Sequence, residues 1–309
     1  MKTMKFGIGI IPQDNLEENI ELIKLAEDVG FEYAWISHKS DMNMYQLLKT
    51  ITLETETIKI GPGVTNPYIK NVENFLYEMI HLNNLSNNRT VFGIGPGNRK
   101  IMKELNRQWS NPVSTLKEYV QKLQESFEKK KSNIPIYIGA QSPKLLRTSG
   151  EISNGCIVNA SHPKDYEELL PHIQKGIGRS KKDMKDFDIA AYTPTSIDND
   201  IEIAKNASKI VVAFIIAGCA PPLLERHNIP QEVRDNIYLS LSRGNIGNAL
   251  RFIDDDLIDI FSVAGTSKDI IPKIDALKKS GVTQFIVSAP FGRQQNESIK
   301  LFEDVISSF

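Results

Sequence analysis

The chain has 309 residues, of which 40% are hydrophobic, and its 37 basic residues nearly balance 38 acidic ones. This composition supports a sizeable core, and the near-neutral charge provides no field that would recruit nucleic acid. The longest apolar segment, Ile210–Gly218, is about half as long as a bilayer-spanning helix. The two cysteines, Cys156 and Cys219, have apolar neighbours and are expected to be small core residues of a cytoplasmic protein.

Apolar runs typical of strands alternate with helical patterns. The predicted strands are Phe6–Ile11, Tyr33–Ile36, Ile58–Ile60, Thr90–Ile94, Pro135–Ile138, Cys156–Val158, Ile189–Tyr192 and Gln284–Val287. The predicted helices are Leu16–Val29, Phe75–Leu85, Ser114–Lys129, Pro143–Gly150, Tyr166–Gly176 and Ile203–Ala217. Since parallel strands need covering helices, this order predicts an α/β fold, a (β/α)8 TIM barrel over residues 1–309 rather than an open sheet. The long gap before the last strand predicts a helical insertion at about residues 201–266.

The carboxyl ends of the predicted strands are rich in small residues and amides. In a barrel of this kind the ligand binds at those ends. Such a rim suits a large, flat, partly anionic ligand held by backbone N–H groups, and it suits neither a metal ion nor a paired acid and base. Ser142 and Pro143 predict a helix N-terminus that can hold phosphate, although a simple capped helix explains the same residues.

Motifs for other chemistries are weak. The segment Gly93–Gly97 lacks the complete GxGxxG pattern and the acidic residue that follows it, which argues against a dinucleotide site. Of the five histidines, only His38 lies at a predicted strand end and is a candidate for ligand contact. No Ser/His/Asp or Cys–His arrangement supports nucleophilic catalysis, so the catalytic residues stay unassigned.

Several longer segments, spread over nearly the whole chain, carry a recognisable family pattern. These segments are Leu25–Ile36, Thr55–Tyr68, Gly93–Gly97, Pro112–Thr115, Ile134–Pro143, Gly150–Gly155, Lys209–Gly218 and Glu225–His227. Together they resemble the methylenetetrahydromethanopterin reductase family of the bacterial-luciferase-like superfamily. The resemblance implies a cytoplasmic barrel enzyme that binds the 5-deazaflavin coenzyme F-420 in its mouth. It further implies hydride transfer to the methylene group of tetrahydromethanopterin, a small-molecule pterin substrate, and no membrane or nucleic-acid partner. We also expect a homo-oligomer.

The family carries a non-prolyl cis peptide at a bulge against the deazaflavin ring, which matches Gly63-Val64 here. The coenzyme tail would lie towards the loops at residues 139–142 and 159–161. The residues expected to bind the coenzyme on this basis are His38, Gly63, Val64, Thr65, Gly95, Asn98, Gly139, Ala140, Gln141, Asn159, Ala160 and Ser161.

Three departures from the family pattern lie near the expected site. Gly9 stands where the family has a glutamate that acts as an acid, and the corner Ser37-His38-Lys39 is one residue shorter than the family's. The link between Leu123 and Ile134 is also short. Two alternatives therefore stay open: a divergent paralogue that binds deazaflavin, pterin or a partner with little turnover, and a flavin mononucleotide monooxygenase of the wider superfamily.

Overall fold

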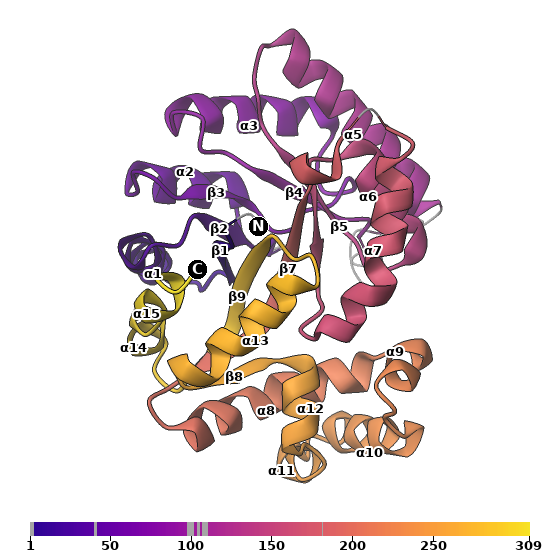
Figure 1. Cartoon of the computed structure of the whole chain (residues 1–309). Helices are drawn as coiled ribbons and strands as arrows, with labels where there is room; N and C mark the ends of the chain where they lie inside the picture. Colours follow the sequence, from indigo (N-terminus) through magenta and orange to yellow (C-terminus); the bar gives the residue numbers. More distant parts are fainter. Residues whose placement is uncertain (1–2, 40–41, 98–101, 104–105, 107–110, 181) are drawn as a thin grey trace.

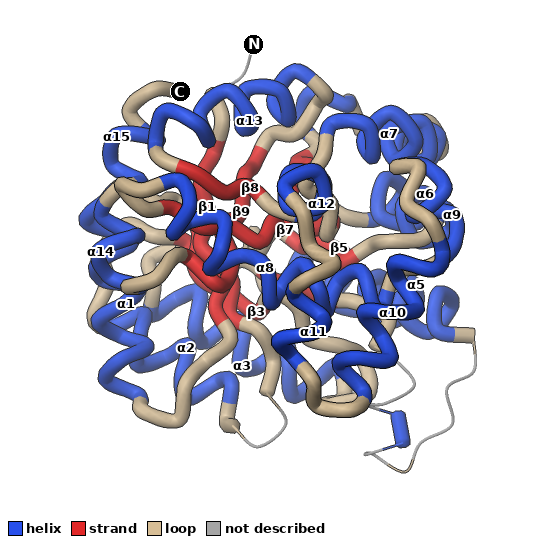
Figure 2. The backbone as a smooth tube through the Cα atoms, turned by 90° about the horizontal axis from the view of Figure 1, so that it is seen from below, coloured by secondary structure: helices blue, strands red, loops and turns tan. Residues whose placement is uncertain are grey.

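The computed structural model describes residues 3–39, 42–97, 102–103, 106, 111–180 and 182–309. Its parallel strands form a barrel in the order β3-β2-β1-β9-β7-β6-β5-β4, and bridges at Ile60–Thr90 and Thr65–Ile94 join β3 to β4. Figure 2 shows these strands at the centre of a ring of helices. The strands are β1 (Lys5–Ile10), β2 (Tyr33–Ile36), β3 (Lys59–Pro62), β4 (Phe92–Ile94), β5 (Ile136–Gly139), β6 (Gly155–Val158), β7 (Asp188–Ile197) and β9 (Gln284–Phe291). The predicted (β/α)8 barrel is confirmed.

Helices cover the outside of the barrel. They are α1 (Leu16–Val29), α2 (Met44–Leu53), α3 (Val72–Leu85), α5 (Pro112–Lys129), α6 (Pro143–Ile152), α7 (Pro163–Ile177), α13 (Ser267–Lys279), α14 (Gln295–Lys300) and α15 (Phe302–Ile306), with a short 3-10 turn at Met184–Asp186. The helix α2 was missed by the sequence reading, although Asn43 caps it by accepting a hydrogen bond from the Gln46 N–H. The predicted Ser142 cap of α6 is present, since its hydroxyl accepts from the Leu145 N–H at 3.4 Å.

Large aromatic rings fill the barrel interior, and glycines make room for them. The interior cluster contains Tyr33, Trp35, Val91, Tyr137, Ile157, Ala190 and Ile286, with Val64 and Tyr192 packed against it. A Cβ on Gly63 would lie 2.6 Å from the Cβ of Trp35, and one on Gly155 would lie 2.6 Å from Tyr137 Cε1. Gly63 and Gly155 therefore face the barrel interior, where the absence of a side chain leaves room for the rings.

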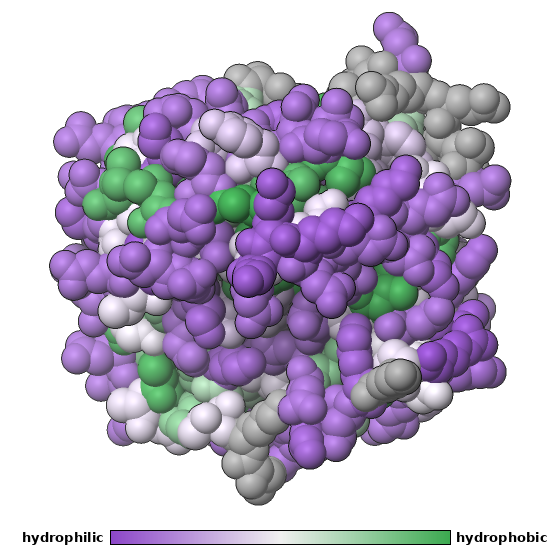
Figure 3. All heavy atoms as spheres, turned by 90° about the horizontal axis from the view of Figure 1, so that it is seen from above, coloured by the Kyte–Doolittle hydropathy of each residue, from purple (hydrophilic) through white to green (hydrophobic). Residues whose placement is uncertain are grey.

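Residues 198–262 form a group of helices at one end of the barrel (Figure 1, orange). They are α8 (Ile201–Gly218), α9 (Pro221–Arg226), α10 (Gln231–Ser242), α11 (Ile246–Leu250) and α12 (Asp255–Phe261), and the short strand β8 (Val263–Gly265) then pairs with the end of β7. These helices share a hydrophobic cluster of their own. Figure 3 shows the opposite face of the molecule, which is mainly hydrophilic with scattered apolar residues.

The long apolar run in α8 is amphipathic. Val212 and Ile216 are buried in the cluster of the end helices, whereas Phe214 is 59% exposed. Among the described residues, no helix is long and apolar enough to cross a membrane. Both cysteines are buried and unpaired, as the sequence predicted.

Candidate functional site

A cavity of about 870 Å³ lies at the carboxyl ends of the strands, between the barrel and the end helices. Its floor and sides come from β1, β7 and β9, from the loops after β5 and β6, and from α6 and α7. The helices α8, α9 and α12 form the facing wall. Most of the lining is apolar, with a few polar side chains, which is the composition typical of a small-molecule site. The position agrees with the site expected for a barrel of this type.

Four of the sequence-predicted site residues line this cavity together: Gln141, Asn159, Ala160 and Ser161. The first follows β5 and the other three follow β6, so adjacent parallel strands bring them to the same edge. Ser161 is held in place because its hydroxyl donates to the Phe261 carbonyl of α12 at 3.1 Å.

A second group of predicted residues surrounds Val64 on the β3–β5 side of the barrel. The peptide between Gly63 and Val64 is cis, as predicted. A Cβ on Gly95 would lie 3.1 Å from a Val64 methyl, and a Cβ on Gly139 would lie 3.3 Å from both methyls. The two glycines therefore form a cradle that a larger residue would fill. Thr65 is buried beside them, and its N–H donates to the Gly93 carbonyl at 3.0 Å.

The remaining predicted residues lie in different surroundings. His38 approaches Thr65, with Nδ1 to Oγ1 at 3.4 Å, and burial followed by the charge of Lys70 lowers the pKa of its imidazole. This favours a neutral imidazole. The Ala140 side chain is buried in the hydrophobic core and its N–H donates to the Ile157 carbonyl at 3.0 Å, so neither group is available to a ligand. Asn98 lies outside the described residues.

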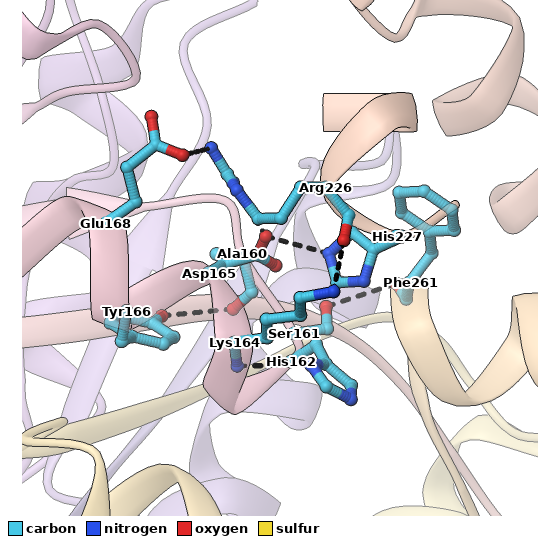
Figure 4. Close-up of polar contacts among 10 residues, drawn as sticks. All are labelled: Ala160, Ser161, His162, Lys164, Asp165, Tyr166, Glu168, Arg226, His227 and Phe261. Carbon is cyan, nitrogen blue, oxygen red and sulfur yellow. Dashed lines mark hydrogen bonds and ion pairs between the residues drawn. The ribbon is translucent and has the colours of Figure 1, made fainter. Parts of the chain in front are cut away.

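A cluster of charged side chains ties α9 to α7 at one side of the cavity (Figure 4). The carboxylate of the buried Asp165 accepts hydrogen bonds from Arg226 Nη1 at 2.8 Å and His227 Nε2 at 2.9 Å. Arg226 also pairs with Glu168, and its backbone carbonyl accepts from the Lys164 ammonium. Burial alone would raise the pKa of Asp165, but the bonds from His227 and Arg226 outweigh it and hold that pKa below its ordinary value.

Sequence reasoning missed Tyr192, which lies at the floor of the cavity directly over Gly9. A Cβ on Gly9 would lie 2.4 Å from Tyr192 Cε2 and 2.7 Å from the phenol oxygen. The ring therefore occupies the space that Gly9 leaves open. Tyr192 follows Ala190 by two residues and thus shares its inward face, but only the structure shows that the face of Ala190 is the inward one.

Asp165 and Arg226 were also missed as site residues. The segment Glu225–His227 stood out only through the family resemblance, and nothing in the local sequence pairs it with Asp165, some 60 residues earlier. Among the described residues, no group of three or more His, Cys, Asp and Glu side chains is arranged to hold a metal ion.

The closed barrel, the bulge at Val64 and the cavity at the strand ends define a class of ligand-binding barrel proteins. The model of the luciferase-like monooxygenase family matches residues 4–284 of this chain. The chain therefore belongs to the luciferase-like family.

Full-length relatives narrow this assignment to the 5,10-methylenetetrahydromethanopterin reductases. The enzyme of that name from Archaeoglobus fulgidus is 38% identical, over 96% of this chain and 97% of its own. The one from Methanopyrus kandleri is 34% identical, over 100% and 99%. The solved structure of the coenzyme F420 dependent tetrahydromethanopterin reductase from Methanopyrus kandleri superimposes with a TM-score of 0.94 over 99% of both chains. The resemblance found in the sequence is thus confirmed.

Proposed function

We propose that this protein is a coenzyme F-420-dependent 5,10-methylenetetrahydromethanopterin reductase. The reaction is transfer of hydride from the reduced deazaflavin to the methylene group on tetrahydromethanopterin, which gives the methyl form. One observation carries the proposal: Val64, which follows the cis peptide, packs against the neighbouring Gly95 and Gly139 in a barrel that matches the solved reductase with a TM-score of 0.94.

The residues present fit a large deazaflavin. A flat ring needs a smooth surface to lie against, and the absence of side chains at Gly95 and Gly139 lets the Val64 methyls pack closely against both residues. The cavity, at about 870 Å³, has the volume typical of sites for large ligands. The amide residues Gln141 and Asn159 also line this cavity. They suit the polar tail of the coenzyme.

The chain contributes binding, orientation and exclusion of water. When bound, the coenzyme supplies the hydride, so the protein need not provide the redox chemistry. The Val64 bulge positions the ring, and the apolar faces of α8, α9 and α12 shield the reacting groups from solvent. Asp165 and Arg226 fix the position of α9 against α7 and thereby set the width of the cavity.

The proposal also covers the domain organisation, the oligomeric state and the cellular location of the protein. We propose that the 309 residues act as one barrel domain with an insertion at about residues 201–266, and that the chain forms a homo-oligomer without binding nucleic acid. A cytoplasmic location is supported by the two buried, unpaired thiols, which suit a reducing compartment.

A binding titration tests the proposal. Purified protein is added to oxidised coenzyme F-420 while the fluorescence of the coenzyme is followed. The same titration with flavin mononucleotide is the matched control. We expect saturable binding of the deazaflavin and a rise in the thermal unfolding temperature on binding. Binding of flavin mononucleotide with no binding of F-420 would contradict the proposal and favour a monooxygenase.

A further inference from the structure

The strand β7 carries one tyrosine, Tyr192, from the barrel interior into the cavity. Tyr192 pairs in register with Ile286 of β9, and both belong to or pack against the interior cluster. The ladder becomes irregular only further along, between Pro194 and Ser196. Regular pairing therefore fixes the direction in which the Tyr192 side chain leaves the strand, and its ring also lines the cavity.

The neighbouring strand β1 leaves space for this ring. Gly9 pairs with Ser288 of β9, and the Tyr192 ring lies so close to Gly9 that any Cβ there would overlap it at 2.4 Å. Without a side chain at this position, the phenol can reach the inner end of the cavity. Gly9 on β1 and Tyr192 on β7 are thus complementary, because the tyrosine ring fills the volume that a side chain at position 9 would occupy.

The Tyr192 hydroxyl is suited to donate a hydrogen bond. Burial raises the pKa of the phenol, and a side-chain hydrogen bond with Ser37 opposes that rise only in part. The phenol is therefore protonated at neutral pH and can act as a donor. Two other polar groups of the lining are engaged elsewhere, since Arg226 is paired with Asp165 and Ser161 donates to the Phe261 carbonyl.

The position of Tyr192 relative to Val64 determines what it can contact. Val64 lies against Gly95 and Gly139, on the β3–β5 side of the mouth, whereas Tyr192 comes from β7 and lies over β1. Both pack on the same interior cluster, and of the two only Tyr192 is among the residues that line the cavity. A flat ring lying on Val64 leaves the Tyr192 side for the second reactant.

We propose that Tyr192 is a catalytic residue whose phenol donates a hydrogen bond to a ring nitrogen of the C1-carrying heterocycle. This contact holds the methylene carbon towards the coenzyme face at Val64. No covalent bond to the phenol forms or breaks. The inference rests on the proposed function, and it assigns the floor of the cavity to the pterin and not to the coenzyme.

The test compares Tyr192→Phe with wild type and with Tyr33→Phe. Tyr33 is a buried tyrosine of the same barrel interior, but its hydroxyl accepts from Lys59 at 3.2 Å at the other end of the barrel. Three quantities are measured for each protein: the Kd of tetrahydromethanopterin by calorimetry without coenzyme, the Kd of F-420 by fluorescence, and kcat. Thermal unfolding checks that each variant is folded.

We expect Tyr192→Phe to weaken pterin binding about 10-fold and to lower kcat about 100-fold, because a donor aimed at the reacting group is lost. The F-420 affinity should not change, and Tyr33→Phe should match wild type in all three quantities. Should Tyr192→Phe fail to fold, Gly9→Ala provides the second variant. Its methyl displaces the ring while keeping the hydroxyl, and it should produce the same loss of pterin binding.

Two results in Tyr192→Phe would overturn the inference: wild-type pterin affinity and kcat, or a loss confined to F-420 affinity. An equal loss in Tyr33→Phe would do so as well, since it would show a general effect on the barrel. A wild-type protein that binds neither F-420 nor pterin would instead refute the proposed function. The two failures are thus distinguishable.

Discussion

Replacing Asp165 by asparagine removes the charge that holds α9 against α7. The side chain is 6% exposed and accepts two charge-assisted bonds, at 2.8 Å from Arg226 and 2.9 Å from His227. Removing one member of a buried pair costs about 3–5 kcal/mol. We expect the lower end, about 3 kcal/mol, because Arg226 retains the half-exposed Glu168 as a partner.

The assay is urea unfolding followed by circular dichroism, with Asp235→Asn as the matched control. Asp235 accepts from Arg234 at 2.8 Å but is a surface carboxylate of the same group of helices, so its loss should have no measurable effect on stability. Because Arg226 lines the cavity, Asp165→Asn should also weaken coenzyme binding.

The pH dependence provides a second check. The pKa of Asp165 is lower in the folded protein than in the unfolded chain. Its contribution to stability is therefore complete above the unfolded pKa, about 3.9, and is lost as the pH falls through the folded pKa. The difference between wild type and Asp165→Asn should shrink below about pH 4. A difference in unfolding free energy under about 1 kcal/mol at neutral pH, or one that grows on acidification, would refute this account of the cluster.

Three more outcomes are expected. Gly139→Leu should weaken F-420 binding at least about tenfold, because its Cβ alone would lie 3.3 Å from both Val64 methyls; unchanged affinity in the fluorescence titration would remove this cradle from the site. Gly9→Glu should lower stability without raising turnover, because its side chain collides with the Tyr192 ring; a stable, faster enzyme would show that the ring moves aside. Burial raises the pKa of the Cys219 thiol to about 11. Its alkylation by iodoacetamide at neutral pH, followed by mass spectrometry, should therefore be about a hundredfold slower than that of a free thiol. Reaction at the free-thiol rate would contradict the burial of Cys219.

Much of the fold could be predicted because hydrophobic periodicity is a local property. The helix α1 matches its predicted span, Leu16–Val29, since an asparagine caps its start and Gly30 ends it in the left-handed region. The helix α2 was missed although its local signals are present: Met44, Leu47, Leu48 and Ile51 recur at helical spacing, and Asn43 caps its start. The last part of β7 was missed because its pairing partner, β8, lies in a distant segment.

The site was predictable only where it is built from strand ends. Gln141 and Asn159 meet because adjacent parallel strands end at the same edge, and that follows from the order of elements. The pairing of Asp165 with Arg226 depends on how α9 packs, and that has no counterpart in local sequence. The contact between Gly9 and Tyr192 could not be predicted for the same reason. The two residues lie on different strands, so the sequence of β1 alone does not show that Tyr192 fills the space beside Gly9.

Isotope transfer tests the reductase assignment most directly. Coenzyme F-420 reduced with deuterium at its transferable position is mixed with 5,10-methylenetetrahydromethanopterin and the purified protein, and the product is analysed by mass spectrometry. The account predicts methyltetrahydromethanopterin that carries one deuterium in its methyl group, formed at a rate proportional to protein concentration. No methyl product, or a methyl product without deuterium, would contradict it.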